Sequence, residues 1–302
     1  MPLLAINHHY FRDSKKGQGI YPTTPLEMEF NLVNLHKNGW KFASQERVVG
    51  FVENKDFISK KLCVITFDDG LKEQMNCLSL LEKFNAKAIF FISTSPVVTN
   101  RVLDVHKMHL IRTKISDEAL AKSLESFGFY GYSFDMDALA LQYRYDEKIS
   151  QKVKYFLNFV LDAEQKQSWI NSLFLKLFSS ESAVAKSLYM DVDDWKTLAK
   201  MGCLATHGHN HLPMATLNSM DIAKDIGASI DLIRDKTCYK VKGIGYPFGG
   251  KTAVSNEVFA IASQFDLRYG FTMRRGINLS ADNPLALDRI DVNDLDGYLS
   301  YP

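Results

Sequence analysis

One stretch of the sequence constrains the fold more than any other, the run Val64-Ile65-Thr66-Phe67-Asp68-Asp69-Gly70. The apolar, β-branched residues from Leu62 to Phe67 predict a buried strand. The strand ends in two adjacent carboxylates, and burying two such charges is costly unless a cation or hydrogen-bond donors compensate for them. A metal ion would account for one carboxylate, and a proton-transfer role would account for the other. The alternative is a strand followed by an ordinary acidic turn.

A second polar cluster, His207-Gly208-His209-Asn210-His211, follows another short apolar run from Gly202 to Ala205. It holds three of the chain's eight histidines. His207 and His211 stand four residues apart, so one helical turn would place them on the same face. With Asp69 they form a two-histidine, one-carboxylate set that leaves coordination positions open for water. The pattern predicts one divalent metal ion, with Zn²⁺ expected first and Ni²⁺, Co²⁺, Mn²⁺ or Fe²⁺ as alternatives.

These motifs resemble those of the NodB-homology polysaccharide deacetylases, carbohydrate esterase family four. Thr66-Phe67-Asp68-Asp69-Gly70 is similar to the first motif of that family. The segment from His207 to His211 is similar to the second, with Gly208 in place of the usual hydroxyl residue. Gly245-Tyr246-Pro247-Phe248-Gly249 is similar to the third. The resemblance implies an α/β fold, an irregular (β/α)7-type barrel of parallel strands, and a metal-dependent N-deacylase.

The resemblance also implies roles for particular residues. Asp68 would be the base that takes a proton from a metal-bound water, and the backbone N–H of Phe248 would bind the developing oxyanion. Tyr246 and Pro247 would contact the substrate. The implied metal ligands are Asp69, His207 and His211.

The arginine of the third motif is absent from this chain, because Gly245 stands in its place. In the family that arginine orients the catalytic aspartate. Arg289, within Asp288-Arg289-Ile290, could supply the same charge to Asp68 from the last strand.

The histidine motif that the family usually carries near its C-terminus is also missing, because no histidine follows His211. Some family members carry this strand at the N-terminus instead, and the segment from Leu4 to Tyr10 resembles that permuted arrangement. His9 then matches the histidine that would protonate the leaving amine. His8 is the alternative donor and a candidate substrate contact. Because adjacent strand residues point to opposite faces, only one of the two histidines should reach the site as the donor.

Strand and helix patterns alternate along the chain, which predicts parallel strands with helical crossovers. Functional residues of such folds collect at the carboxyl ends of strands. Thr24-Pro25-Leu26-Glu27 is a strong helix start, and Leu26, Phe30 and Val33 are expected to form the apolar face of that helix. Lys41 to Val49 is expected to form a short strand and a turn. The other expected strands are Leu3 to Ile6, Ala88 to Ile92, Gly202 to Ala205, Val241 to Gly245, Leu267 to Met273 and Leu287 to Val292.

An interruption between Pro96 and Tyr189 is longer than a loop and is expected to be mostly helical. We therefore predict a deacetylase barrel over residues 1–96 and 190–302, with a helical insertion over residues 97–189 that could act as a lid. The aromatic run Gly128 to Phe134 could stack on sugars, or it could pack the core of the insertion.

Composition restricts the partners and the compartment. The formal net charge is +1 and there is no basic tract, which disfavours nucleic acid as a partner. No segment is long and apolar enough to predict a membrane span, and the N-terminus lacks the features of a signal peptide. The four cysteines show no paired spacing, which suits a reducing, cytoplasmic setting. The oligomeric state is left open.

Together these observations predict hydrolysis of an N-acyl group, with acetyl expected first, from an amino sugar or a glycan precursor. Three alternatives stay open. The same fold could serve a deformylase or a deacetylase of a non-sugar amide. The missing arginine could instead mark a catalytically inactive glycan-binding protein. A non-haem iron oxygenase shares the two-histidine, one-carboxylate set, but it gives no reason for Asp68.

Overall fold

The computed structural model describes residues 2–15, 20–53, 61–143 and 146–301, and the chain divides into two compact units. One unit comprises Met1–Lys15, Pro22–Arg101 and Ala185–Pro302. The other is formed mainly by Val102–Val184. Among the described residues, none of the helices has both the length and the hydrophobicity that crossing a membrane requires.

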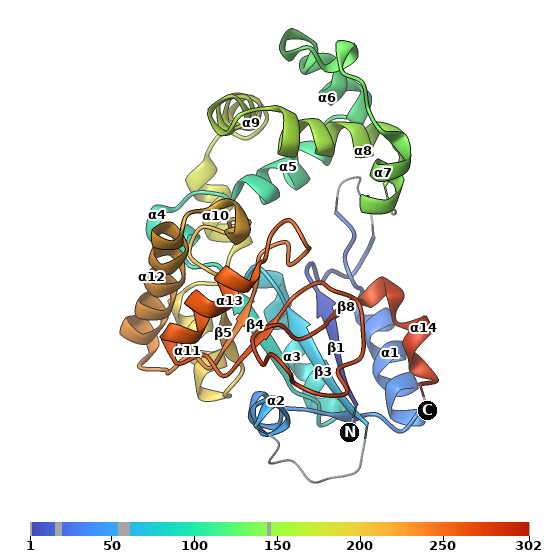
Figure 1. Ribbon diagram of the computed structural model, residues 1–302, viewed down its shortest axis with the longest axis vertical. Coiled ribbons are helices and arrows are strands. Elements are labelled where there is room, and N and C mark those ends of the chain that lie inside the picture. The colour runs from blue at the N-terminus through green and yellow to red at the C-terminus, as the bar shows by residue number, and fades with distance from the viewer. Residues whose placement is uncertain (1, 16–19, 54–60, 144–145, 302) are drawn as a thin grey trace. The chain divides into compact units, whose positions relative to one another are not determined.

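The first unit is built on an eight-stranded sheet that is visible at the centre of that unit (Figure 1). Its strands follow the order β7-β6-β5-β4-β3-β1-β8, and β2 pairs with the start of β3. All of these strand pairs are parallel, so the predicted parallel α/β class is confirmed. The strands are β1 (Leu3–His8), β2 (Lys41–Phe42), β3 (Leu62–Phe67), β4 (Ala88–Ile92), β5 (Leu204–Thr206), β6 (Gly243–Gly245), β7 (Tyr269–Phe271) and β8 (Ile290–Asp291).

Strands β1 and β3 are neighbours in the sheet. All six residues of each strand are buried, as expected for parallel strands that are covered on both faces. Asn7 pairs with Thr66 and His8 pairs with Phe67, so the two strands end side by side. On its other edge β1 pairs with β8 through Ile6 and Ile290. The bounds predicted for β3 and β4 are confirmed, and β1 is two residues longer than expected.

Helices connect the strands of the first unit and cover the sheet. They are α1 (Pro25–Lys37), α2 (Gln45–Val52), α3 (Leu78–Lys83), α4 (Ser95–Thr99), α11 (Val192–Lys200), α12 (Ser219–Thr237), α13 (Asn256–Ala262) and α14 (Asp296–Leu299). Four short 3₁₀ segments add to them, η1 (Lys72–Cys77), η5 (Met214–Thr216), η6 (Ser263–Phe265) and η7 (Val292–Asp294).

Helix α1 begins as predicted but buries a different face. The Thr24 side chain accepts from the Glu27 N–H and the Glu27 carboxylate accepts from the Thr24 N–H, which completes a capping box. The expected apolar face is wrong, because Leu26 and Phe30 are 80% and 62% exposed. The residues that pack inward follow the i, i+4, i+7 spacing of the opposite stripe. They are Met28, Leu32 and Leu35.

The segment after β2 is a helix, so the expected turn through Val49 is wrong. Ser44 caps α2 by accepting a hydrogen bond from the Arg47 N–H. The adjacent residues Val48 and Val49 favour a strand by their intrinsic propensity. However, Val48, Phe51 and Val52 are buried at the spacing of a helix. Tertiary packing decides the conformation here.

The second unit is helical. Its helices are α5 (Asp104–Arg112), α6 (Asp117–Ser123), α7 (Met136–Gln142), α8 (Lys148–Tyr155) and α9 (Ala163–Leu177), with a π-helical turn at Phe156–Val160 and 3₁₀ turns at Glu125–Phe127 and Phe129–Gly131. Helix α10 (Glu181–Leu188) contains the boundary between the units.

The aromatic run of the second unit contributes to its core. Phe129 is 2% exposed, and its ring lies 5.5 Å from that of Phe134 and 5.3 Å from that of Phe156. Tyr130 is instead 61% exposed. Core packing therefore accounts for Phe129, and a lid role for this unit stays a prediction.

Candidate active site

The predicted site residues come from strand ends at one edge of the sheet. Asp68 and Asp69 follow β3, His207 follows β5, and Tyr246 follows β6. Strand β4 lies between β3 and β5, and β5 pairs with β6. Because all these strands are parallel, their carboxyl ends meet at the same edge. The sheet topology thus gathers three segments that are far apart in sequence.

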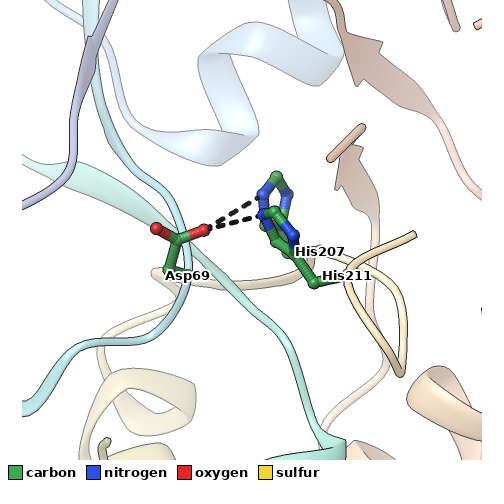
Figure 2. A group of neighbouring side chains, drawn as sticks. All are labelled: Asp69, His207 and His211. Carbon is green, nitrogen blue, oxygen red and sulfur yellow. Dashed lines mark ion pairs between the residues drawn. The ribbon is translucent and has the colours of Figure 1, made fainter. Parts of the chain in front are cut away.

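Three of these side chains form a compact cluster (Figure 2). The Oδ1 atom of Asp69 lies 3.4 Å from Nε2 of His207 and 3.2 Å from Nε2 of His211. All three residues are buried, and their ligand atoms lie within 4.8 Å of one another. Two atoms bound to one Zn²⁺ at about 2.0–2.1 Å in a tetrahedral arrangement would lie roughly 3.3 Å apart. The spacing and the donor types therefore fit a divalent metal ion.

The ring orientation of His207 also fits a metal ligand. Its Nδ1 atom lies 2.6 Å from the carbonyl oxygen of Gly245, which can only accept a hydrogen bond. Nδ1 must therefore carry a proton, so Nε2, the nitrogen that faces Asp69, is the one available to bind a metal ion when the ring is neutral. Burial alone would lower the pKa of His207, but the charges of Asp68 and Asp69 raise that pKa above its ordinary value. The two carboxylates thus create a strong local preference for a cation.

The histidine segment is not a helix, so the expectation of one helical turn is wrong. Gly208 and His211 have φ angles of +75° and +55°, which fold the chain back on itself. The rings of His207 and His211 then meet with centroids 5.1 Å apart. Asp69 has a φ angle of +79° as well. Left-handed conformations at non-glycine residues are strained, and they cluster at functional sites.

Asp68 does not join the three-residue cluster but forms an ion pair with Arg289. The two guanidinium nitrogens Nη1 and Nη2 each donate to one carboxylate oxygen at 2.7 Å. Asn7 of β1 also donates to Oδ2 of Asp68 at 3.1 Å. Burial alone would raise the pKa of Asp68, but Arg289, His207 and His9 together lower it. Asp68 is therefore held as a carboxylate.

The structure explains why glycine occupies position 245. A Cβ atom there would lie 2.8 Å from Cγ of Phe91, closer than side chains tolerate. The guanidinium of Arg289 lies over the same Phe91 ring, 5.6 Å from its centroid. An arginine side chain therefore has no room at position 245. The charge opposite Asp68 comes from the start of β8 instead.

The two adjacent histidines at the end of β1 lie in different surroundings. His8 is 4% exposed, its ring stacks on Phe67, and its Nδ1 atom lies 3.0 Å from the Thr23 hydroxyl oxygen. Burial and then the charge of His9 lower the pKa of His8 to about 3. The substrate contact expected of His8 stays a prediction. His9 is partly exposed, and its charge acts on Asp68.

The segment after β6 makes a tight turn. The N–H of Gly249 donates to the carbonyl oxygen of Pro247 at 2.7 Å, with Phe248 between them at a φ angle of +60°. The Phe248 ring is 49% exposed and contacts the ring of His211. The N–H of Phe248 has no hydrogen-bond acceptor among the described residues. Tyr246 is fully buried and its ring packs against that of Phe259, so its substrate contact stays a prediction.

No model of a known protein family matches this sequence, and no curated protein matches it either. Solved structures do match over the whole chain. The deacetylase PplD of Streptococcus pyogenes, in complex with acetate, aligns with a TM-score of 0.64 at 15% identity, covering 100% of this chain and 99% of that one. IcaB from Ammonifex degensii aligns with a TM-score of 0.61 at 13% identity, covering 99% and 97%. The de-N-acetylase from Aggregatibacter actinomycetemcomitans aligns with a TM-score of 0.60 at 15% identity, covering 96% and 95%.

The fold is that of these deacetylases. The barrel-like α/β fold of parallel strands expected from the motifs is thereby confirmed, and the N-terminal permutation stays a prediction. Two residues, Gln74 and Asn7, contact the site but were not expected from the sequence. Gln74 is buried and donates to the carbonyl oxygens of His9 and Asp68, at 2.8 and 2.6 Å. Asn7 could have been found from the pairing of β1 with β3, whereas Gln74 carries no signal in the sequence.

Proposed function

We propose that this chain is a metal-dependent hydrolase that removes an N-acyl group, with acetyl expected first, from an amino sugar or a glycan precursor. One observation carries the proposal. A buried Asp-His-His cluster of metal-ligand spacing stands beside an arginine-paired carboxylate, at the strand ends of a deacetylase fold. The acetate in complex with PplD and the name of the de-N-acetylase from Aggregatibacter actinomycetemcomitans support the choice of acyl group.

Asp69, His207 and His211 would hold the metal, and two nitrogens with one carboxylate oxygen are a donor set that suits Zn²⁺. Such an ion lowers the pKa of a coordinated water and polarises a carbonyl group. The Gly245 carbonyl oxygen keeps Nε2 of His207 free to bind it. Ni²⁺, Co²⁺, Mn²⁺ and Fe²⁺ remain alternatives for the same ligands.

Asp68 would accept the proton of the attacking water. Its lowered pKa keeps it ionised, and the bidentate contact with Arg289 fixes both carboxylate oxygens in position. A base of lowered pKa is weak, so it is adequate only toward a water that the metal has already acidified. Arg289 would thus orient the base and keep it charged.

His9 would protonate the leaving nitrogen, and the N–H of Phe248 would donate to the developing oxyanion. His9 emerges at the end of β1 beside the end of β3, and its charge acts on Asp68. The carbonyl oxygen of His9 shares the Gln74 amide with the carbonyl oxygen of Asp68. The Gln74 side chain would therefore fix the backbone of both the proposed acid, His9, and the proposed base, Asp68. Pro247 would set the turn that presents the Phe248 N–H.

The test is a screen of the purified, metal-loaded protein against acylated amino sugars, their oligomers and simple acylated amines. We expect free acetate from at least one amino-sugar substrate, and release about 10²–10⁴-fold slower from the Asp68→Asn variant. Formate release would favour a deformylase, and release from simple amines alone would favour a non-sugar deacetylase. Stoichiometric metal without turnover would indicate a glycan-binding protein, and turnover that requires oxygen would indicate an oxygenase. A cytoplasmic location stays a prediction.

A further inference from the structure

The histidine loop, defined as residues 207–211, lies against one acidic side chain of helix α12. Asp225 is 4% exposed. Its Oδ2 atom accepts from the N–H of His209 at 2.8 Å, and its Oδ1 atom accepts from the N–H of Asn210 at 2.9 Å. The Asn210 side chain donates to Oδ1 as well, at 2.9 Å. One carboxylate thus binds two successive backbone amides between the two candidate metal ligands.

The loop has no regular secondary structure to fix its shape. Its carbonyl groups are held from the other side, since the Ser95 N–H donates to the His209 carbonyl oxygen at 2.9 Å. Without Asp225, the backbone N–H groups of the half-buried His209 and the exposed Asn210 would need other acceptors. Charge-assisted bonds from a carboxylate are stronger than neutral ones. Asp225 is therefore the contact best suited to define the loop.

Gly208 is matched to this contact. A Cβ atom at position 208 would lie 2.6 Å from Oδ2 of Asp225 and 3.0 Å from Cε of Met214. The φ angle of +75° at this residue is also one that side chains disfavour. A serine or threonine at position 208 would not fit while Asp225 keeps its present position. Gly208 and Asp225 thus behave as a pair.

We propose that Asp225 is a positioning residue for the metal centre. Its carboxylate sets the curvature of the histidine loop, and that curvature brings Nε2 of His207 and Nε2 of His211 to Asp69. Gly208 is the counterpart that lets the loop approach the carboxylate. Partners that orient metal ligands in this way typically change metal affinity about 10–100-fold when they are removed. The inference rests on the proposed metal site.

The experiment titrates metal-free protein with Zn²⁺ and records the absorption spectrum of the Co²⁺ form. Asp225→Asn places an amide donor against a backbone N–H, and we expect it to bind Zn²⁺ about 10–100-fold more weakly, with an altered Co²⁺ spectrum. Asp231→Asn is the matched control, because it makes the same change on the same helix at an exposed residue paired with Arg234. Its Zn²⁺ affinity and Co²⁺ spectrum should equal those of the wild type.

Gly208→Ala disturbs the same contact from the side of the loop and leaves α12 unchanged. It therefore tests the proposal even if Asp225→Asn does not fold. We expect a similar loss of Zn²⁺ affinity. In the Asp225→Ala background the same alanine should cost less, because the clashing oxygen is gone, and the double variant should show non-additive effects. Wild-type affinity in Asp225→Asn or in Gly208→Ala, or strictly additive losses, would overturn the inference.

The outcome is separable from the fate of the proposed reaction. A wild type that binds Zn²⁺ but hydrolyses no amide would remove the reaction and leave the role of Asp225 standing. A wild type that binds neither Zn²⁺ nor Co²⁺ would remove the metal site and this inference together.

Discussion

The two halves of the site are held by different means. In the acid half, Asp68 is fixed by side chains of neighbouring strands, with Asn7 on β1 and Arg289 at the start of β8. In the histidine half, the ligands sit on a loop whose backbone is bound by Asp225 and whose first ring donates to a backbone carbonyl. In the acid half, contacts between side chains fix the position of Asp68. In the histidine half, contacts to the backbone fix the shape of the loop that carries the ligands.

This difference predicts that the halves fail separately. Removing a charge from the acid half should leave a buried ion without its partner, which costs stability and catalysis. Disturbing the loop should cost metal affinity first. Each variant below is therefore measured for metal binding, turnover and unfolding.

The largest effect is expected when a metal ligand is removed. His207→Ala should weaken Zn²⁺ binding by more than the roughly 100-fold that marks the upper range for residues behind the ligands. The matched control is His209→Ala, because His209 lies in the same loop but pairs with the Thr94 hydroxyl at 2.8 Å outside the cluster. Metal analysis and Zn²⁺ titration provide the measurement. Undiminished metal in both His207→Ala and His211→Ala would remove this site.

Asp68→Asn should lower kcat by about 10²–10⁴-fold, the usual contribution of a general base. The amide cannot accept a proton from water. Because Asp68 stands outside the Asp69 cluster, we expect Zn²⁺ affinity to stay close to that of the wild type. Steady-state kinetics at saturating Zn²⁺ test this. Near-normal turnover would make Asp68 a structural residue.

Arg289→Met leaves the Asp68 carboxylate buried without its main partner. Breaking a buried pair in this way costs about 3–5 kcal/mol of unfolding free energy. Arg274→Met is the control, since Arg274 pairs with Asp288 at the surface, where such pairs contribute about 0–1 kcal/mol. Denaturant unfolding of the metal-free proteins gives both values. Equal losses in the two variants would contradict the distinction between the halves.

His9→Ala should lower kcat by roughly 10²-fold and abolish the alkaline limb of the pH–rate profile, because a protonated donor is then missing. His8→Ala should keep that limb, since His8 lies buried against Phe67. If the alkaline limb survives in His9→Ala and is lost in His8→Ala, the proton donor is His8 and not His9. Survival in both would sink the permuted-strand interpretation.

The sequence predicted the acid half better than the histidine half, for a physical reason. Asp68 and Asp69 follow a strand whose bounds were predicted correctly, and strand order then decides their neighbours. Arg289 was named as a possible partner of Asp68, and the structure places it there. The shape of the loop around Gly208 depends on contacts with a distant helix, which no local pattern reveals. For the same reason the helical turn expected at His207 was wrong.

Helix α1 shows the same limit within the fold. The capping box of Thr24 and Glu27 is a local interaction and was predicted correctly. The buried face of the helix depends on how it meets the sheet, and Leu26 was placed on the wrong side. Interactions within a turn of chain could be predicted, whereas interactions that the sheet topology creates could not.

The smallest effect, measured over a single pH unit, concerns His8, whose ring stacks on Phe67 at the end of β3. Its pKa is lowered from 6.5 to about 3 in the folded protein, chiefly by burial. The unfolded chain therefore takes up a proton near pH 6.5 while the folded chain does not, so stability falls as the pH drops below 6.5 and levels off near the folded pKa. This group alone should cost about 1.4 kcal/mol of unfolding free energy for each pH unit in that window.

His8→Phe keeps the stacking on Phe67 and removes the titration, so its unfolding free energy should fall less steeply between pH 6.5 and 5.5. The matched control is His36→Phe, which makes the same substitution at an exposed histidine of α1. Equal slopes in His8→Phe and the wild type would show that folding does not change proton binding by His8, and the distinction between His8 and His9 would then lose its physical basis.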